Sequence, residues 1–115
     1  MQKHVLKMPK YDSFEKLGHR GKIYPVDKIT STSSFVYIET ETGLETTILN
    51  HECNCFYYVL EGKGYFIIDD IKENFEKNDL VVIQAETKFT FKGKCKLLRI
   101  NTPAFYQEQE ETISD

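Results

Sequence analysis

The segment from Tyr58 to Gly64, which reads YVLEGKG, decides the fold class of this 115-residue chain. Aromatic and β-branched residues lead into a predicted turn at Glu61-Gly62-Lys63, which is typical of a strand that ends in a tight turn. Outward from this segment, similar short runs recur in both directions and indicate an all-β sandwich or barrel. The predicted strands are Lys22–Val26, Ser34–Glu39, Leu44–Leu49, Phe56–Leu60, Gly64–Ile68, Ile71–Phe75, Asp79–Gln84, Thr87–Phe91 and Cys95–Asn101, after a helical turn at Tyr11–Leu17.

The length of the chain fits one domain. We expect an N-terminal arm at residues 1–20, a β-barrel at residues 21–106 and an acidic C-terminal tail at residues 107–115. The tail is polar, so we expect a frayed end or a short surface helix there.

Charge and hydropathy argue against several classes of partner. The net charge is −3, without the basic patch that nucleic acid requires. No apolar run reaches the roughly 20 residues that span a membrane, and residues 1–10 lack the hydrophobic core of a secretory signal. Three cysteines are an odd number, which argues against a disulfide framework. We therefore expect a cytoplasmic protein that contacts neither nucleic acid nor membrane.

Two stretches together resemble the motifs of the cupin superfamily. Residues His51–Gly64 resemble a first motif that reads H-x-H, four residues, then E, and runs into Y-V-L-E-G-x-G. Residues Asn78–Phe91 follow the spacing of the second motif, G-D-x-V-x-I-P-x-G-x-x-H-x-F, and Asn101–Pro103 resembles a common cupin ending. The resemblance covers roughly residues 40–105 and implies a double-stranded β-helix, the cupin or jelly-roll barrel.

The same alignment implies that the usual metal ligands are replaced. The three family histidines fall on Leu49, His51 and Phe89, and the glutamate falls on Cys55. Leucine and phenylalanine have no lone pair to donate, so we expect no metal cofactor. The alternative is a site of His51, Cys53 and Cys55, which a regular strand would point to one face, with Cys95 as a fourth ligand.

The alignment also predicts which side chains face the interior. Strand alternation adds Tyr57 and Phe91 to the aligned positions. The interior would be mostly apolar with a few polar side chains, among them Glu45 or Arg99. Such an interior would either bind a small organic ligand or be filled by the barrel's own side chains. The predicted pocket residues are Leu49, His51, Cys55, Tyr57, Phe89 and Phe91.

Three functions remain open. The first is a metal-free protein that binds a small molecule, with sugar-derived metabolites included, as a sensor, carrier or helper of another protein. The second is a metal-independent isomerase, epimerase or lyase with His51 as base and Tyr57 as acid, because a histidine pKa near 6.5 suits proton transfer. The third is a metalloprotein that uses His51, Cys53 and Cys55. We interpret the remaining histidines, His4 and His19, as solvated.

The family resemblance also implies a symmetric homodimer, because the barrel must cover its sheet edges. The segment around Ile23 and Tyr24 is the predicted edge.

Overall fold

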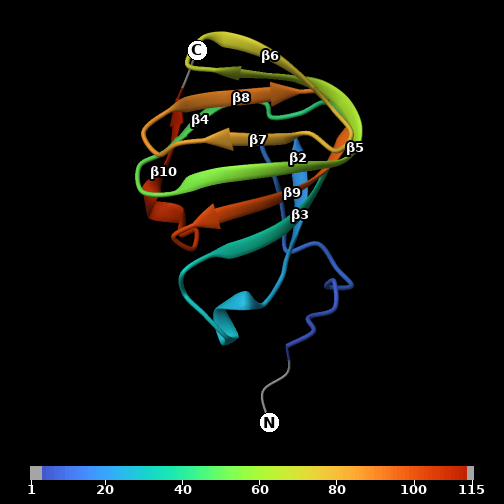
Figure 1. The fold of residues 1–115 in the computed structure, drawn as a ribbon, viewed down its shortest axis with the longest axis vertical. Coiled ribbons are helices and arrows are strands. Elements are labelled where there is room, and N and C mark those ends of the chain that lie inside the picture. The colour runs from blue at the N-terminus through green and yellow to red at the C-terminus, as the bar shows by residue number, and fades with distance from the viewer. Residues whose placement is uncertain (1–3, 114–115) are drawn as a thin grey trace.

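The computed structural model describes residues 4–113, which form a curled antiparallel sheet with two short 3-10 helices (Figure 1). This arrangement confirms the all-β prediction. The elements are β1 (Phe14–Lys16), β2 (His19–Ile23), η1 (Val26–Lys28), β3 (Ser34–Thr40), β4 (Thr47–Asn50), β5 (Asn54–Ile68), β6 (Ile71–Glu76), β7 (Leu80–Ile83), β8 (Lys88–Lys92), β9 (Cys95–Thr102), η2 (Gln107–Gln109) and β10 (Glu110–Ile113).

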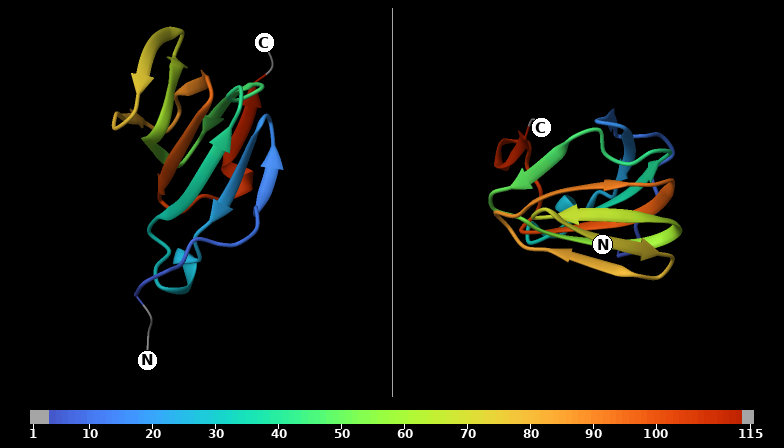
Figure 2. Two further views of the ribbon diagram at one scale, coloured as in Figure 1. Left: turned by 90° about the vertical axis from the view of Figure 1, so that its right-hand side faces the viewer. Right: turned by 90° about the horizontal axis from the view of Figure 1, so that it is seen from above.

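The long strand β5 belongs to both faces of the barrel. Its first half pairs with β9 and β7, and its second half pairs with β8 and β6. Sheet A therefore has the order β1-β2-β3-β9-β5-β7, and sheet B has the order β10-β4-β8-β5-β6. Figure 2 shows the two sheets curling around a common interior.

The turn predicted at residues 61–63 is wrong, because the strand β5 continues through these residues without ending. The pairing with β9 shifts register between Val59 and Glu61, where a β-bulge bends the strand. Gly62 has a φ of +91°, and a Cβ atom there would overlap the carbonyl oxygen of Lys94. The glycine therefore lets the strand bend from one sheet into the other.

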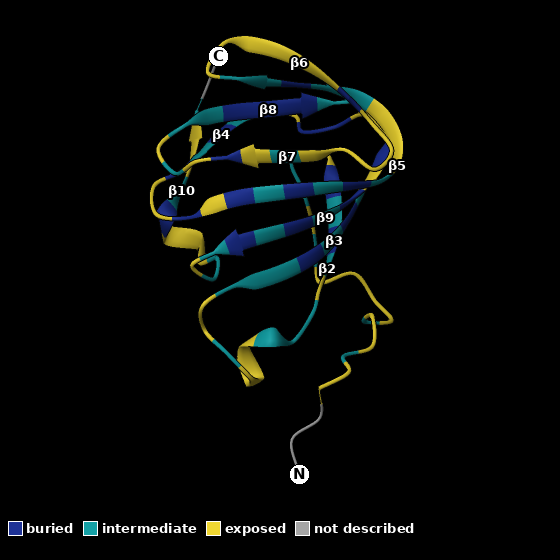
Figure 3. Cartoon of the chain, in the orientation of Figure 1, coloured by how far each residue is buried: buried dark blue, intermediate teal, exposed yellow. Residues whose placement is uncertain are grey.

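Segments near both ends of the described chain pair with strands of the barrel. The segment predicted as a helical turn contains the strand β1, which pairs with β2 from Phe14↔Gly21 to Lys16↔His19. The segment predicted as a frayed end or a helix contains β10, which pairs with β4. Sheet pairing thus begins before residue 21 and continues past residue 106, while residues 4–13 remain outside any helix or strand and are largely exposed (Figure 3).

The segment around Ile23 and Tyr24 does not offer a free edge. The amide of Ile23 donates to Ser13 Oγ at 2.9 Å, and the amide of Tyr24 donates to the carbonyl of Phe35 at 3.0 Å. Its donors are therefore already used within the chain.

Aromatic rings fill the middle of the barrel. The Tyr57 ring centroid lies 5.3 Å from that of Phe66, 5.9 Å from that of Phe89 and 5.8 Å from that of Phe91. All four residues are buried, and tilted or edge-to-face contacts of this kind stabilise a core. At this level the barrel is filled by its own side chains. Among the described residues, no helix has the length and apolar character needed to cross a membrane.

Candidate binding site at the barrel mouth

The structure divides the six residues predicted to line the interior. Leu49 and His51 face away from the core, because Ile48 and Asn50 are the inward residues of β4. The motif alignment is therefore wrong by one residue in β4. A shift of one residue along a strand exchanges the side chains that face the core with those that face outward. The other four lie buried in the core, namely Cys55, Tyr57, Phe89 and Phe91.

His51 lies on the surface, in a bend that follows β4. Its Nδ1 lies 3.1 Å from both carboxylate oxygens of Glu86, and its Nε2 lies 2.8 Å from Oε1 of Glu111. The hydrogen bonds to these two carboxylates raise the pKa of His51 above its ordinary value, and the hydrogen bond to Glu111 has the larger effect. The predicted acid–base pair of His51 and Tyr57 is not formed, because Tyr57 is packed among aromatic rings.

The described residues do not fit a metal centre at the predicted place. His51 is outside the barrel, and Cys53 Sγ lies 3.3 Å from the carbonyl oxygen of Pro103. Cys55 Sγ accepts hydrogen bonds from the side-chain amides of Asn50 and Asn101, at 3.3 and 3.0 Å. Within residues 4–113, no three His, Cys, Asp or Glu side chains converge as a metal site would require. Burial also raises the pKa of Cys55 to about 11, which opposes the thiolate that a metal binds.

An open cavity of about 380 Å³ lies where β1, β3, β9 and the segment before β10 meet. Its volume falls within the range of small-molecule sites. Most of the exposed surface of its wall is apolar, although five of the nine lining residues have polar or charged side chains. The lining residues are Ser13, Phe14, Lys16, Ile23, Ser34, Val36, Arg99, Phe105 and Gln107.

Arg99 is the unusual group in this wall. It is only 6% exposed, and strand pairing places it between Val36 and Tyr57 on the inner face of sheet A. Its guanidinium lies 5.2 Å from the ring centre of Phe105, and Tyr57 is its cross-strand neighbour on β5. Among residues 4–113, its Nε has no hydrogen-bond partner, and no ion pair includes it. A buried charge without a carboxylate is costly for the fold.

A second polar cluster borders the same cavity. Nζ of Lys16 donates to Oε1 of Gln107 at 2.9 Å and lies 3.7 Å from Oε1 of Glu110, whose side chain is 5% exposed. Nε2 of Gln107 donates to the same Glu110 oxygen at 3.4 Å. The mouth of the barrel therefore combines two cations, one shielded carboxylate and an amide around an apolar wall.

His19 is buried against this region and is not the solvated loop residue that the sequence predicts. Its ring lies 5.3 Å from that of Phe14 in an edge-to-face contact, and its Nδ1 has no hydrogen-bond partner among the described residues. Burial, together with the nearby Arg99 charge, lowers the pKa of His19 to about 4. The imidazole is therefore neutral at physiological pH.

Sequence reasoning considered Arg99 but missed the residues around it. Arg99 could be recognised because buried and more exposed residues alternate along β9. The residues on its inner face are Cys95, Leu97, Arg99 and Asn101. Lys16 and Glu110 carry no such signal, because they come from segments predicted as an arm and a tail, and Phe105 follows the last predicted strand. Only the pairing of β1 and β10 brings them together.

Comparison with known proteins gives structural matches only. No protein-family model and no curated protein matches the sequence. A variant of Pac13 from Streptomyces with uridine matches with a TM-score of 0.89 and 20% identity over 98% of this chain and 92% of that one. Pac13 is described as a nucleoside dehydratase.

Two further structures share the architecture at lower similarity. KdgF from Halomonas matches with a TM-score of 0.70 and 15% identity, covering 81% of this chain and 86% of its own. A cupin-superfamily sugar phosphate isomerase from Silicibacter pomeroyi matches with a TM-score of 0.63 and 16% identity, covering 74% and 59%. The chain therefore has the fold of the small cupins, a double-stranded β-helix, as the motifs at residues 51–64 and 78–91 predicted.

Proposed function

We propose that this protein binds a small sugar-derived molecule of about nucleoside size in the cavity at the barrel mouth. The observation that carries the proposal is Arg99, a buried guanidinium with an unpartnered Nε beside an apolar cavity. A ligand oxygen, either anionic or a carbonyl, would supply the missing acceptor.

The rest of the wall fits such a ligand. Phe14 and Phe105 offer flat apolar surfaces to a ring, while Lys16 and Gln107 offer a donor and an acceptor to hydroxyl groups. Pac13, which has the same fold, binds uridine in its solved structures. Uridine is therefore the first probe to test.

Binding calorimetry with uridine, other nucleosides and sugar acids tests the proposal. We expect one ligand of this panel to bind and Arg99→Gln to weaken it about 10- to 100-fold, because a hydrogen bond to a charged group contributes roughly 1.5–3 kcal/mol. Lys96→Gln, at an exposed position of the same strand, is the matched control and should bind as the wild type does. Binding that survives Arg99→Gln unchanged would contradict the proposed site.

The shielded Glu110 supports a second candidate function, a metal-independent isomerase, epimerase or lyase. Here Glu110, which contacts the cavity residues Lys16 and Gln107, would take a proton from a carbon atom of the ligand and return it to the product or to the leaving group. Lys16 would stabilise the negative charge that develops between the two steps. In this mechanism Glu110 and Lys16 would perform the proton transfer and charge stabilisation for which the sequence predicted His51 and Tyr57.

Turnover assays separate the two functions. If the protein is an enzyme, Glu110→Gln should abolish conversion of the bound ligand, followed by NMR, while its Kd changes less than about threefold. Wild-type protein that binds the ligand and never converts it is a sensor or carrier instead.

A further inference from the structure

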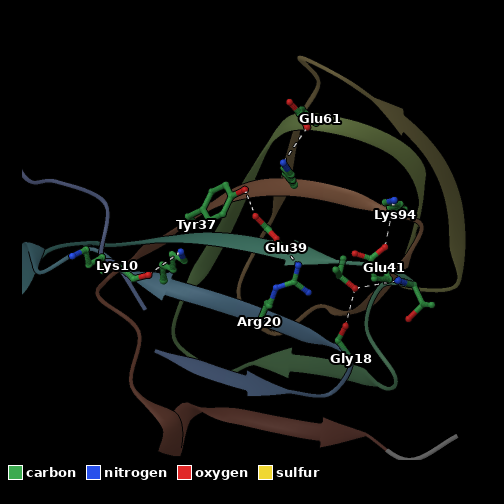
Figure 4. Close-up of polar contacts among 12 residues, drawn as sticks. Lys10, Gly18, Arg20, Tyr37, Glu39, Glu41, Glu61 and Lys94 are labelled. Carbon is green, nitrogen blue, oxygen red and sulfur yellow. Dashed lines mark hydrogen bonds and ion pairs between the residues drawn. The ribbon is translucent and has the colours of Figure 1, made fainter. Parts of the chain in front are cut away.

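The two arginines of the chain have opposite electrostatic surroundings. Arg20 of β2 lies opposite Glu39 of β3, and its guanidinium binds the Glu39 carboxylate, which also accepts a 2.6 Å hydrogen bond from the Tyr37 hydroxyl (Figure 4). Arg99 is buried, and among residues 4–113 no carboxylate lies within ion-pair distance of its guanidinium. The described fold therefore leaves the charge of Arg99 uncompensated, at a cost to its stability.

The acidic groups near Arg99 do not supply the missing charge, because they keep their protons. Burial raises the pKa of Cys55 to about 11 and also raises the pKa values of Cys53 and Tyr57. The charge of Arg99 lowers all three pKa values, but burial has the larger effect. Burial and then the charge of Arg99 lower the pKa of His19 to about 4. At pH 7 these four neighbours are therefore neutral.

The charges around the cavity add up to a small positive excess. None of the nine described residues that line the cavity carries a carboxylate. Glu110 lies next to this wall, and its Oε1 is 3.7 Å from Nζ of Lys16, with only 5% of its side chain exposed. Two cations, Lys16 and Arg99, against the one carboxylate of Glu110 leave one net positive charge, and it lies at Arg99 because Lys16 already has a partner.

Aromatic rings place this charge where a ligand ring can also bind. The Arg99 guanidinium lies 5.2 Å from the ring centre of Phe105, and Nζ of Lys16 lies 5.9 Å from the same ring centre and 5.8 Å from that of Phe14. A carboxylate accepts two parallel hydrogen bonds from the edge of a guanidinium. Nε of Arg99 belongs to such an edge and has no acceptor among the described residues.

We propose that the ligand of this cavity is a monocarboxylic acid, either a sugar acid or a nucleoside carboxylic acid, whose carboxylate binds Arg99. This inference rests on the proposed function, because it names the charged group that a sugar-derived ligand carries in the same cavity. One negative charge balances the one net positive charge of the site, whereas a neutral ligand leaves a buried guanidinium uncompensated. A phosphate group, with roughly 1.5 to 2 negative charges at pH 7, exceeds that charge.

Two series of compounds that differ in the charge of one group test the inference by calorimetry at pH 7.5. One series is uridine, uridine-5′-carboxylic acid and uridine 5′-monophosphate, and the other is glucose, glucuronic acid and glucose 6-phosphate. In at least one series, the carboxylic acid should bind at least about tenfold more tightly than both the neutral compound and the phosphate, because a hydrogen bond between charged groups is stronger than a neutral one.

Variants of the two arginines assign the preference to Arg99. In Arg99→Gln, the affinity for the acid should fall to that for the neutral compound. Arg99→Lys should retain part of the preference, because it keeps the charge and loses the planar pair of N–H groups. Arg20→Gln is the matched control and should keep the full preference, because Arg20 does not line the cavity. Circular dichroism establishes that all three variants fold.

A neutral compound that binds the wild type as tightly as its acid overturns the inference and leaves the proposed function standing. Tighter binding of the phosphate overturns it as well, and so does a preference for the acid that survives in folded Arg99→Gln. If none of the six compounds binds the wild type, the result contradicts the proposed function together with the inference, so the two failures are distinguishable.

Discussion

At the scale of single residues, two histidines of the described chain have opposite environments. His19 is buried with an unpartnered nitrogen, and its pKa is lowered to about 4. His51 is exposed between two carboxylates, and its pKa is raised. The sequence predicted the reverse, a solvated His19 and an inward His51, because the residue type alone does not show which way a bend turns a side chain.

Acid should destabilise the protein through His19. The unfolded chain binds a proton at this residue below about pH 6.5, whereas the folded chain does so only below about 4, so stability is lost as pH falls between these values. The full shift amounts to roughly 3 kcal/mol of unfolding free energy. Urea denaturation of wild type and His19→Gln from pH 7.5 to 4 measures it. The wild type should lose more stability than the variant, and parallel curves would contradict the buried neutral imidazole.

The opposite sign applies to His51. Its raised pKa means that its contribution to stability is present below about pH 6.5 and is lost as pH rises through the folded-state pKa. The difference in melting temperature between wild type and His51→Ala should therefore be larger at pH 6 than at pH 8.5. His4→Ala, at an exposed position of the N-terminal arm, serves as the control. An equal difference at both pH values would show that the ion pairs with Glu86 and Glu111 do not form in solution.

At the scale of elements, β5 accounts for the shape of the barrel. The sequence predicted two strands and a turn here, because a glycine pair normally ends a strand. The pattern was misleading because a bulge and a turn both use glycine at positive φ, and only the partner strand β9 distinguishes them.

Replacing Gly62 tests the role of the bulge. Gly62→Ala should cost at least about 2 kcal/mol of unfolding free energy, because its φ is positive and the new methyl group would overlap the Lys94 carbonyl. Lys63→Ala, at the neighbouring exposed position, should change stability by less than about 0.5 kcal/mol. Chemical denaturation of both variants gives the comparison. A stable Gly62→Ala variant would mean that β5 bends elsewhere.

The terminal strands mark the limit of prediction at this scale. Alternation revealed the central strands, whose inner residues are apolar. In contrast, β1 has three residues and β10 has four, and two residues of each are charged. Their pairing with β2 and β4 supplies the order that their own pattern lacks. The candidate site was missed for the same reason, since Phe14, Lys16 and Glu110 lie on these two strands.

At the scale of the whole molecule, the inner face of sheet A holds Arg99 beside the cavity. The barrel centre between the sheets is filled by aromatic rings, which leaves the mouth as the place for a ligand. The predicted cupin fold was correct because two motifs agreed in spacing, whereas the predicted pocket assumed that the family's inward positions apply to β4.

A crystal structure of the protein grown with uridine, or with the tightest ligand of the calorimetric panel, tests whether the cavity at the barrel mouth is the binding site. We expect ligand density in this cavity, with a ligand oxygen within hydrogen-bond distance of the Arg99 guanidinium and a ring against Phe14 or Phe105. Ligand density instead beside His51 on the outer surface, or in the separate open pocket that Glu73 of β6 and Leu80 of β7 help to line, would contradict this binding site.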